Sequence, residues 1–185
     1  MKKFNYISFF IFFVTFSLNV VAQDTRSGYF NNTKVGFMSV LSEEYGGGFI
    51  STVNGWHFTE NLATGIGLAV QGYRDAPIFY PIYAQATYFI KREVSSPYAY
   101  GNVGYSLTFE ELYRGSISYE LGLGWQFKVG GITMGPEIGY RRERWQARTG
   151  NAIPDPNNDN NIIVEYTGYT NAFLKQINFG LSLFF

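Results

Sequence analysis

Residues 117–129 (ISYELGLGWQFKV) alternate strictly between large apolar side chains and small or polar ones. One face of this segment carries Tyr119, Leu121, Leu123, Trp125, Phe127 and Val129. The other face carries Glu120, Gly122, Gly124, Gln126 and Lys128. A period of two residues is typical of a β-strand whose two faces meet different surroundings. The pattern recurs over residues 62–73 and 176–185, so the sequence predicts an all-β fold.

The small-residue face indicates what the large apolar face contacts. A soluble β-sandwich packs its large apolar side chains inside and presents charged side chains to water. Here the opposite face is mostly glycine and short polar residues, and charged residues make up only 15% of the chain. Small side chains suit the crowded interior of a narrow barrel, and outward apolar side chains suit lipid. Because backbone polar groups in lipid must all be paired, we predict a closed antiparallel up-and-down transmembrane β-barrel.

Eight strands are expected from this pattern. Their predicted ranges are 33–42, 47–58, 62–74, 78–90, 98–109, 116–129, 132–147 and 170–185. The connection 148–169, which contains the polar run NAIPDPNNDNN, is predicted as a long outer loop. Residues 161–170 could instead extend the last strand or form an extra one. Their apolar residues are out of phase with Ile177 onward, so we predict a bulge or break between the two segments.

Residues 1–22 have the features of a secretory signal peptide. Lys2 and Lys3 precede an apolar stretch, and Ala22 supplies a small residue at the expected cleavage site. A transmembrane anchor is the alternative, but the apolar run is shorter than the roughly 20 residues that a spanning helix needs. We therefore expect residues 23–185 to form the barrel. Basic and acidic residues number 14 each and cysteine is absent, which argues against a nucleic-acid partner and excludes a disulfide scaffold.

The Gly-Gly dipeptide at 130–131 predicts a tight two-residue turn, and with it a strand register. Pairing Val129 with Ile132 places Glu120 opposite Arg141 on the inner face. The polar cluster predicted for the lumen consists of Glu120, Lys128, Glu137 and Arg141. Such a cluster could line a conducting path or fill the interior with ion pairs. Because an eight-stranded interior is just wide enough for side chains, we expect a filled lumen.

Aromatic residues make up 19% of the chain and gather at the predicted strand ends. Amphipathic rings are typical of the two levels at which a membrane meets water. The set predicted for the periplasmic boundary is Trp56, Phe58, Tyr88, Tyr98, Trp125, Phe184 and Phe185. The set predicted for the outer boundary is Tyr73, Tyr80, Phe109, Tyr113, Tyr140 and Trp145. A packed aromatic core is the alternative interpretation.

The chain ends in INFGLSLFF, with a terminal phenylalanine and apolar residues at every second position. This ending resembles the C-terminal strand signature of bacterial outer-membrane proteins, carried here by Phe179, Leu181, Leu183 and Phe185. The hairpin FTENLATGIGLAVQGY at 58–73 is similar to one in small outer-membrane β-barrel proteins of the OmpX type. The resemblance implies an eight-stranded barrel in the bacterial outer membrane, recognised by the barrel-assembly machinery. It implies no particular task, because members of the group differ in role.

His57 is the single histidine, so a histidine-based catalytic site would have to use it. It is predicted at the periplasmic end of its strand, away from the outer leaflet where some lipid-modifying enzymes of this membrane act. A two-residue turn after it would point the ring to lipid, and a three-residue turn would point it into the lumen. Asp155 and Asp159 could supply oxygen ligands to Ca²⁺, but their spacing matches no EF-hand loop, and a polar loop is favoured. We therefore expect no catalytic residue, no cofactor and no metal.

The sequence thus favours a monomeric outer-membrane barrel with a structural or surface-interaction role. Its expected partners are outer-membrane lipid and lipopolysaccharide. Arg142 and Arg144 are predicted to point outward near the outer boundary, where they could meet anionic headgroups. Three alternatives stay open, namely a narrow porin, a lipid-A-modifying enzyme and a secreted soluble ligand-binding barrel.

Overall fold

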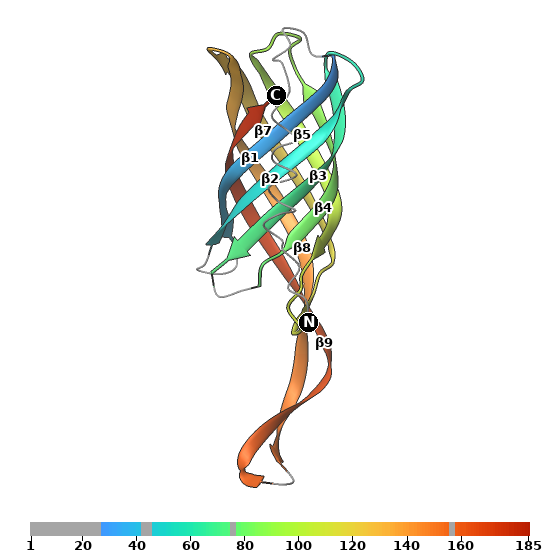
Figure 1. Cartoon of the computed structure of the whole chain (residues 1–185), viewed down its shortest axis with the longest axis vertical. Coiled ribbons are helices and arrows are strands. Elements are labelled where there is room, and N and C mark those ends of the chain that lie inside the picture. The colour runs from blue at the N-terminus through green and yellow to red at the C-terminus, as the bar shows by residue number, and fades with distance from the viewer. Residues whose placement is uncertain (1–26, 42–45, 75–76, 156–157) are drawn as a thin grey trace, which may run out of the picture.

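A computed structural model describes residues 27–41, 46–74, 77–155 and 158–185, although the side chains of 152–166 and 172 are outside that description (Figure 1). The described residues form nine strands. They are β1 (Gly28–Val40), β2 (Gly46–His57), β3 (Leu62–Tyr73), β4 (Tyr80–Phe89), β5 (Ser96–Leu107), β6 (Tyr113–Arg114), β7 (Ile117–Val129), β8 (Ile132–Asp155) and β9 (Asn158–Phe184). No helix in these ranges is long and apolar enough to cross a membrane. The predicted signal peptide lies outside the described residues.

Eight of these strands close into a barrel. The wall runs β1–β2–β3–β4–β5–β7–β8–β9, and β9 returns to pair with β1, from Asn32 opposite Phe184 to Val40 opposite Gln176. Each of these pairings is antiparallel. The predicted closed eight-stranded barrel is therefore confirmed. The short strand β6 pairs with the part of β8 around Gln146 and Ala147.

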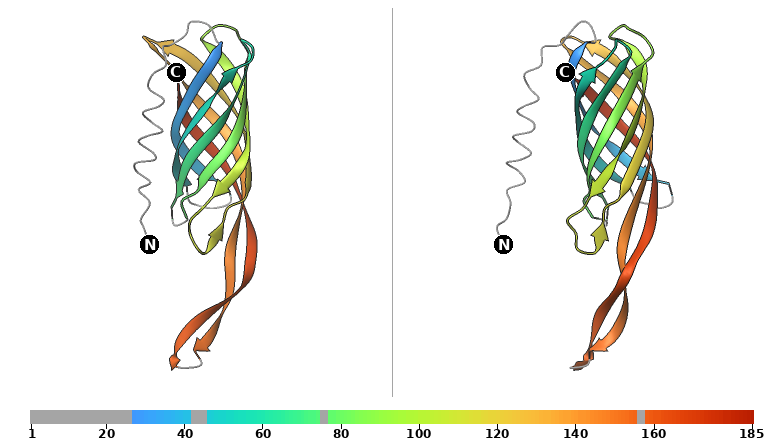
Figure 2. Two further views of the ribbon diagram at one scale, coloured as in Figure 1. Left: turned by 45° about the vertical axis from the view of Figure 1, so that its right-hand side comes forward. Right: turned by 90° about the vertical axis from the view of Figure 1, so that its right-hand side faces the viewer.

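Strands β8 and β9 continue past the barrel as a long two-stranded ribbon (Figures 1 and 2). The prediction of a loop over 148–169 was wrong, because these residues pair with one another from Arg148 opposite Tyr169 to Asp155 opposite Asn158. Pro154 is tolerated there, since each strand of a two-stranded ribbon is an edge. We call the end of the barrel that carries this ribbon the ribbon end. The opposite end, with the connections 58–61, 90–95 and 130–131, is the turn end.

A β-bulge lies in the ribbon near the barrel. Thr149 pairs with Gly168, whereas Gly150 pairs with Tyr166, so Thr167 is the extra residue. A one-residue shift exchanges the two faces of a strand. The bulge confirms the predicted change of phase before Ile177, and residues 161–170 extend the last strand rather than forming another one.

The first strand begins at Gly28, five positions before the predicted start at 33. Asparagine has low β-propensity, and two asparagines stand at positions 31 and 32. In the structure they pair with β2, and Asn31 Nδ2 donates a hydrogen bond of 2.9 Å to Oγ1 of Thr52. Cross-strand hydrogen bonds thus compensate for the weak local preference.

Large apolar side chains cover the outside of the barrel. Leu121 and Leu123 on β7 expose 65% and 61% of their surfaces, and Phe37 on β1 exposes 76%. An apolar belt of this extent is unfavourable in water, and it matches the lipid-facing band of a membrane barrel. Because the wall closes on itself, backbone groups within the belt find partners in the sheet. The predicted outward direction of the alternating apolar residues is confirmed.

Glycines on the inner face make room for tyrosine rings from the neighbouring strand. A Cβ atom at Gly122 would lie 2.4 Å from Cζ of Tyr100, and one at Gly124 would lie 2.4 Å from Cζ of Tyr98. Both rings are buried inside the barrel. The lumen is therefore filled by aromatic rings as well as by small residues.

Four residues predicted for the aromatic girdles point inward instead. Tyr98 and Tyr73 are buried in the interior, and Phe184 and Trp145 pack against the interior clusters. The girdle assignment used closeness to a strand end and ignored the alternation of side-chain direction. Trp56, Tyr88 and Trp125 expose about half of their surfaces, as boundary residues would. The girdle prediction was therefore wrong for these four inward-pointing residues.

Candidate functional site in the barrel interior

A lysine and a glutamate form an ion pair inside the barrel. Nζ of Lys34 on β1 lies 2.6 Å from Oε2 of Glu137 on β8, and both side chains are almost fully buried. The other oxygen, Oε1, accepts hydrogen bonds from the hydroxyl of Tyr98 at 2.5 Å and from Oγ of Ser182. Glu137 thus joins four strands, and a buried charge is tolerable here because it is paired and hydrogen-bonded.

Arg141 is the second buried cation. Its Nε lies 3.4 Å from Oε2 of Glu143, and its Nη1 lies 3.8 Å from Oε2 of Glu120. Its Nη2 donates to the hydroxyls of Ser106 and Ser118 at 3.3 and 3.2 Å. The guanidinium group of Arg141 therefore contacts side chains of β5, β7 and β8.

One tyrosine connects the two ion-pair groups. Nζ of Lys34 lies 3.8 Å from the ring centroid of Tyr100, which is within cation–π distance. The Tyr100 hydroxyl donates a hydrogen bond of 2.8 Å to Oε1 of Glu120. The buried network, by which we mean Lys34, Glu120, Glu137, Arg141 and Glu143, is thus continuous across the lumen. It carries two positive and three negative groups, so most of its charge is paired.

Aromatic clusters lie on both sides of this network. Towards the ribbon end, the Tyr73 hydroxyl donates to Oε1 of Gln176 at 3.0 Å, and Phe79 packs edge-on against Trp145. Towards the turn end, Phe30 and Phe89 are buried together with Tyr98. Charges in the middle and rings towards both ends fill the lumen.

The structure separates one predicted cluster residue from the other three. Glu120, Glu137 and Arg141 are buried in the network, whereas Lys128 is exposed. The predicted register is nevertheless present, because Glu120 pairs with Arg141 and Lys128 pairs with Thr133. Lys128 lies next to the 130–131 turn. Alternation places its side chain on the inner face of β7, but at this end of the barrel the side chain lies beyond the packed interior.

Two residues of the network, Lys34 and Glu143, were not predicted from the sequence. Lys34 lies on the opposite face of its strand from the exposed Phe37, and Glu143 shares the face of Glu137 and Arg141. The alternation that identified the other members would have identified both.

His57 lies at the turn end and points inward. Its ring centroid is 5.0 Å from that of Phe30 and 5.7 Å from that of Phe89. The N–H of Phe58 donates to the carbonyl of Leu62 at 2.9 Å, which leaves residues 59–61 as the turn. This is the three-residue alternative. Among the described residues, no group of three or more histidine or carboxylate side chains could hold a metal ion. The side chains of Asp155 and Asp159 are outside the description.

The C-terminal signature residues lie in the strand that closes the barrel. Phe179 and Leu181 point outward, and Leu183 and Phe185 are half-buried. The N–H of Phe185 donates to the carbonyl of Asn31 at 2.8 Å. The signature therefore coincides with the seam between the first and last strands.

No family model matches the sequence, and no curated protein matches it. The solved structures that are similar to this chain include two outer-membrane proteins. The outer membrane protein OprG from Pseudomonas aeruginosa superimposes with a TM-score of 0.60 at 8% identity, over 90% of this chain and 99% of that one. Neisserial surface protein A (NspA) gives a TM-score of 0.48 at 16% identity, over 83% and 94%. By fold, the chain is a closed eight-stranded antiparallel barrel of the bacterial outer-membrane kind.

Proposed function

We propose that this chain is an integral outer-membrane protein with a structural or surface-interaction role. Its filled barrel serves as a rigid membrane base for the β8–β9 ribbon. The observation that carries this proposal is the combination of a buried ion-pair network with a ribbon that continues two wall strands. A filled lumen favours a barrel that supports the ribbon over one that lets solutes pass.

The base of the ribbon is anchored by side chains. The ring of Tyr113 on β6 stacks on Trp145 of β8, with centroids 5.1 Å apart. The guanidinium of Arg114 lies 4.0 Å from the ring centroid of Tyr169 on β9. These contacts connect a short neighbouring strand to both arms of the ribbon. A ribbon held in this way can present a surface at a distance from the membrane.

The connections support an orientation with the ribbon outside the cell. Membrane barrels have short periplasmic turns and longer outer connections, and the turn end here carries 58–61, 90–95 and 130–131. We propose that the protein is a monomer, that the barrel-assembly machinery inserts it, and that outer-membrane lipid surrounds it. Membership of the OmpX type stays a prediction, carried by the 58–73 hairpin and the last strand.

Single-channel recording in planar bilayers tests the proposal. The full chain, refolded and inserted, is expected to give no steady, reproducible openings, because paired charges and rings occupy the lumen. A large porin recorded in the same bilayer is the positive control. A reproducible unit conductance would overturn the filled-lumen proposal in favour of the narrow-channel alternative.

A lipid-A-modifying activity is the other alternative. The inward direction of His57 at the turn end supports a packing role for its ring, which lies against the rings of Phe30 and Phe89. Mass spectrometry of lipid A from cells with and without the protein separates the two functions. An acyl change that disappears in His57→Ala would favour the enzyme.

A further inference from the structure

A row of basic side chains lies on the outer face of β8 and β9, towards the ribbon end. Arg142 on β8 pairs directly with Lys175 on β9, and Arg144 lies two positions further along β8. All three point away from the lumen, because Arg141 and Glu143, which alternate with the two arginines, are buried inside, as are Leu174 and Gln176 on either side of Lys175. Like charges directly opposite each other across two strands repel. The three residues Arg142, Arg144 and Lys175 are called the basic row below.

Among the described residues, the side-chain partners of Arg142 and Arg144 are neutral. Nη1 of Arg142 donates to the hydroxyl of Tyr119 at 3.4 Å, and its guanidinium carbon lies 4.8 Å from the ring centroid of Phe173. Nε and Nη2 of Arg144 both donate to Oδ1 of Asn171, at 3.1 and 2.8 Å. Within the described ranges, none of the three cations lies in an ion pair with a carboxylate. Among the described residues, the row therefore carries positive charge that no carboxylate pairs, and side-chain contacts hold Arg142 and Arg144.

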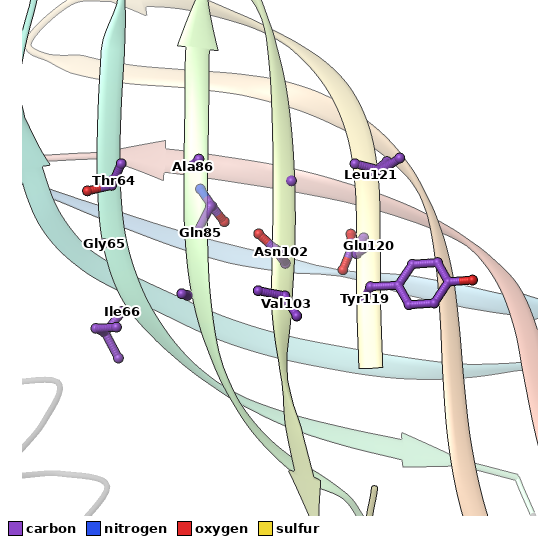
Figure 3. Close-up of a pocket in the computed structure, with 12 residues that line it drawn as sticks. Thr64, Gly65, Ile66, Gln85, Ala86, Asn102, Val103, Tyr119, Glu120 and Leu121 are labelled. Carbon is purple, nitrogen blue, oxygen red and sulfur yellow. The ribbon is translucent and has the colours of Figure 1, made fainter. Parts of the chain in front are cut away.

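An apolar groove lies on the outer face of the barrel (Figure 3). It crosses β3, β4, β5 and β7 and has a volume of about 560 Å³. Its floor consists of Ala84, Ala86 and Gly101, and its walls include Ile66, Val103 and Leu121. Tyr119 lines the groove and also accepts the hydrogen bond from Arg142. The charged row and the groove are thus parts of one continuous surface.

We propose that the basic row and the groove form a binding site for one lipopolysaccharide molecule of the outer leaflet. A phosphate of its lipid A part lies between Arg142 and Lys175, and one acyl chain lies over Ala84 and Ala86. The proposal rests on the membrane location proposed above. Phosphate accepts charge-assisted hydrogen bonds from guanidinium and ammonium groups, and it converts the repulsion within the row into attraction.

Charge complementarity favours lipopolysaccharide over an ordinary phospholipid. The row offers three cations side by side, and lipid A carries more than one phosphate, whereas a glycerophospholipid presents a single one. The groove is open along its length, and the burial of an acyl chain against small side chains increases dispersion contact. The ribbon end, where the row lies, is the end that we place in the outer leaflet.

Binding of purified rough lipopolysaccharide to the full chain in detergent micelles tests the charged part of the site. The double variant Arg142→Gln and Lys175→Gln is expected to weaken binding about tenfold or more, since each basic residue near a lipid surface contributes roughly 1 kcal/mol. Arg74→Gln is the matched control, because Arg74 is an exposed cation at the ribbon end on the other side of the barrel. Phosphatidylglycerol and phosphatidylcholine are titrated in parallel.

Filling the groove tests the apolar part independently. Ala84→Leu and Ala86→Leu add bulk to its floor and are expected to weaken lipopolysaccharide binding several-fold while they leave folding unchanged. Ala99→Leu is the matched control, because Ala99 pairs with the outward-facing Tyr88 but does not line the groove.

The outcomes separate the site from the fold. Heat-modifiable gel migration first shows that the wild type and each variant are folded; a wild type that never folds in micelles or bilayers contradicts the proposed function itself. If the folded double variant and the groove variants bind like the wild type, the site is wrong. Equal affinity for phosphatidylglycerol would overturn the assignment to lipopolysaccharide, and preferred binding of lipopolysaccharide, lost in both sets of variants, supports it.

Discussion

Glu137→Gln is expected to lower the free energy of unfolding by about 3–5 kcal/mol. The substitution leaves the ammonium group of Lys34 buried without its anion, at a position where the side chain is only 4% exposed. It also weakens the acceptor for the hydroxyls of Tyr98 and Ser182. Urea unfolding in micelles, followed by tryptophan fluorescence and gel migration, measures the change.

Two further variants show whether the pair itself is responsible. Lys128→Gln removes an exposed charge and is expected to change stability by no more than about 0.5 kcal/mol. Combining Lys34→Met with Glu137→Leu removes both buried charges and is expected to restore much of the loss. A Glu137→Gln variant as stable as Lys128→Gln would show that the buried network does not hold the interior together.

Leu123→Arg is expected to destabilise the barrel in a phospholipid bilayer by about 2–4 kcal/mol. Leu123 lies at the middle of β7, points outward and exposes 61% of its surface. In hydrocarbon, the new charge loses its hydration and finds no partner among the neighbouring apolar side chains. The folded fraction in vesicles as a function of urea measures the effect.

The matched control is Leu112→Arg, an exposed leucine in the segment between β5 and β6. At that position the charge meets water and headgroups, so folding close to that of the wild type is expected. If Leu123→Arg tolerated urea in vesicles as well as Leu112→Arg does, the outer face would not lie in lipid.

Side-chain direction could be predicted from the sequence because a strand alternates with a period of exactly two. Tyr119, Leu121 and Leu123 point outward as the pattern predicted. A two-residue turn at the Gly-Gly dipeptide allows only one pairing of the two flanking strands, so the β7–β8 register could be predicted. The structure has this register, with Glu120 opposite Arg141.

Alternation alone could not predict how deep in the lumen a side chain lies, or which side chain it contacts across the lumen. Alternation assigns Lys128 and Glu137 to the same side, and only the three-dimensional position of the turn leaves Lys128 exposed. Nor does the sequence show which inward glycine lies under which ring, as Gly122 does under Tyr100. These contacts join residues of different strands, and they depend on the closure of the whole wall.

The ribbon was mistaken for a loop because of its composition. Residues 150–161 are rich in asparagine, aspartate and proline, which favour turns. The pairing of residues 148–155 with 158–169 outweighs these local preferences. The change of phase before Ile177 was the one signal that indicated a strand extension, and the bulge at Thr167 is its cause.

Spin-label accessibility along β7 tests the central claim most directly, because the chain contains no native cysteine. Single cysteines replace the outward residues Leu121 and Leu123 and the inward residues Ser118 and Gln126, in protein reconstituted into bilayers. Labels at the outward positions are expected to collide with dissolved oxygen and to be shielded from a water-soluble nickel reagent, whereas labels at the inward positions contact neither freely. Outward labels that collide with the nickel reagent, or that are shielded from both reagents, would contradict a barrel whose apolar face meets lipid.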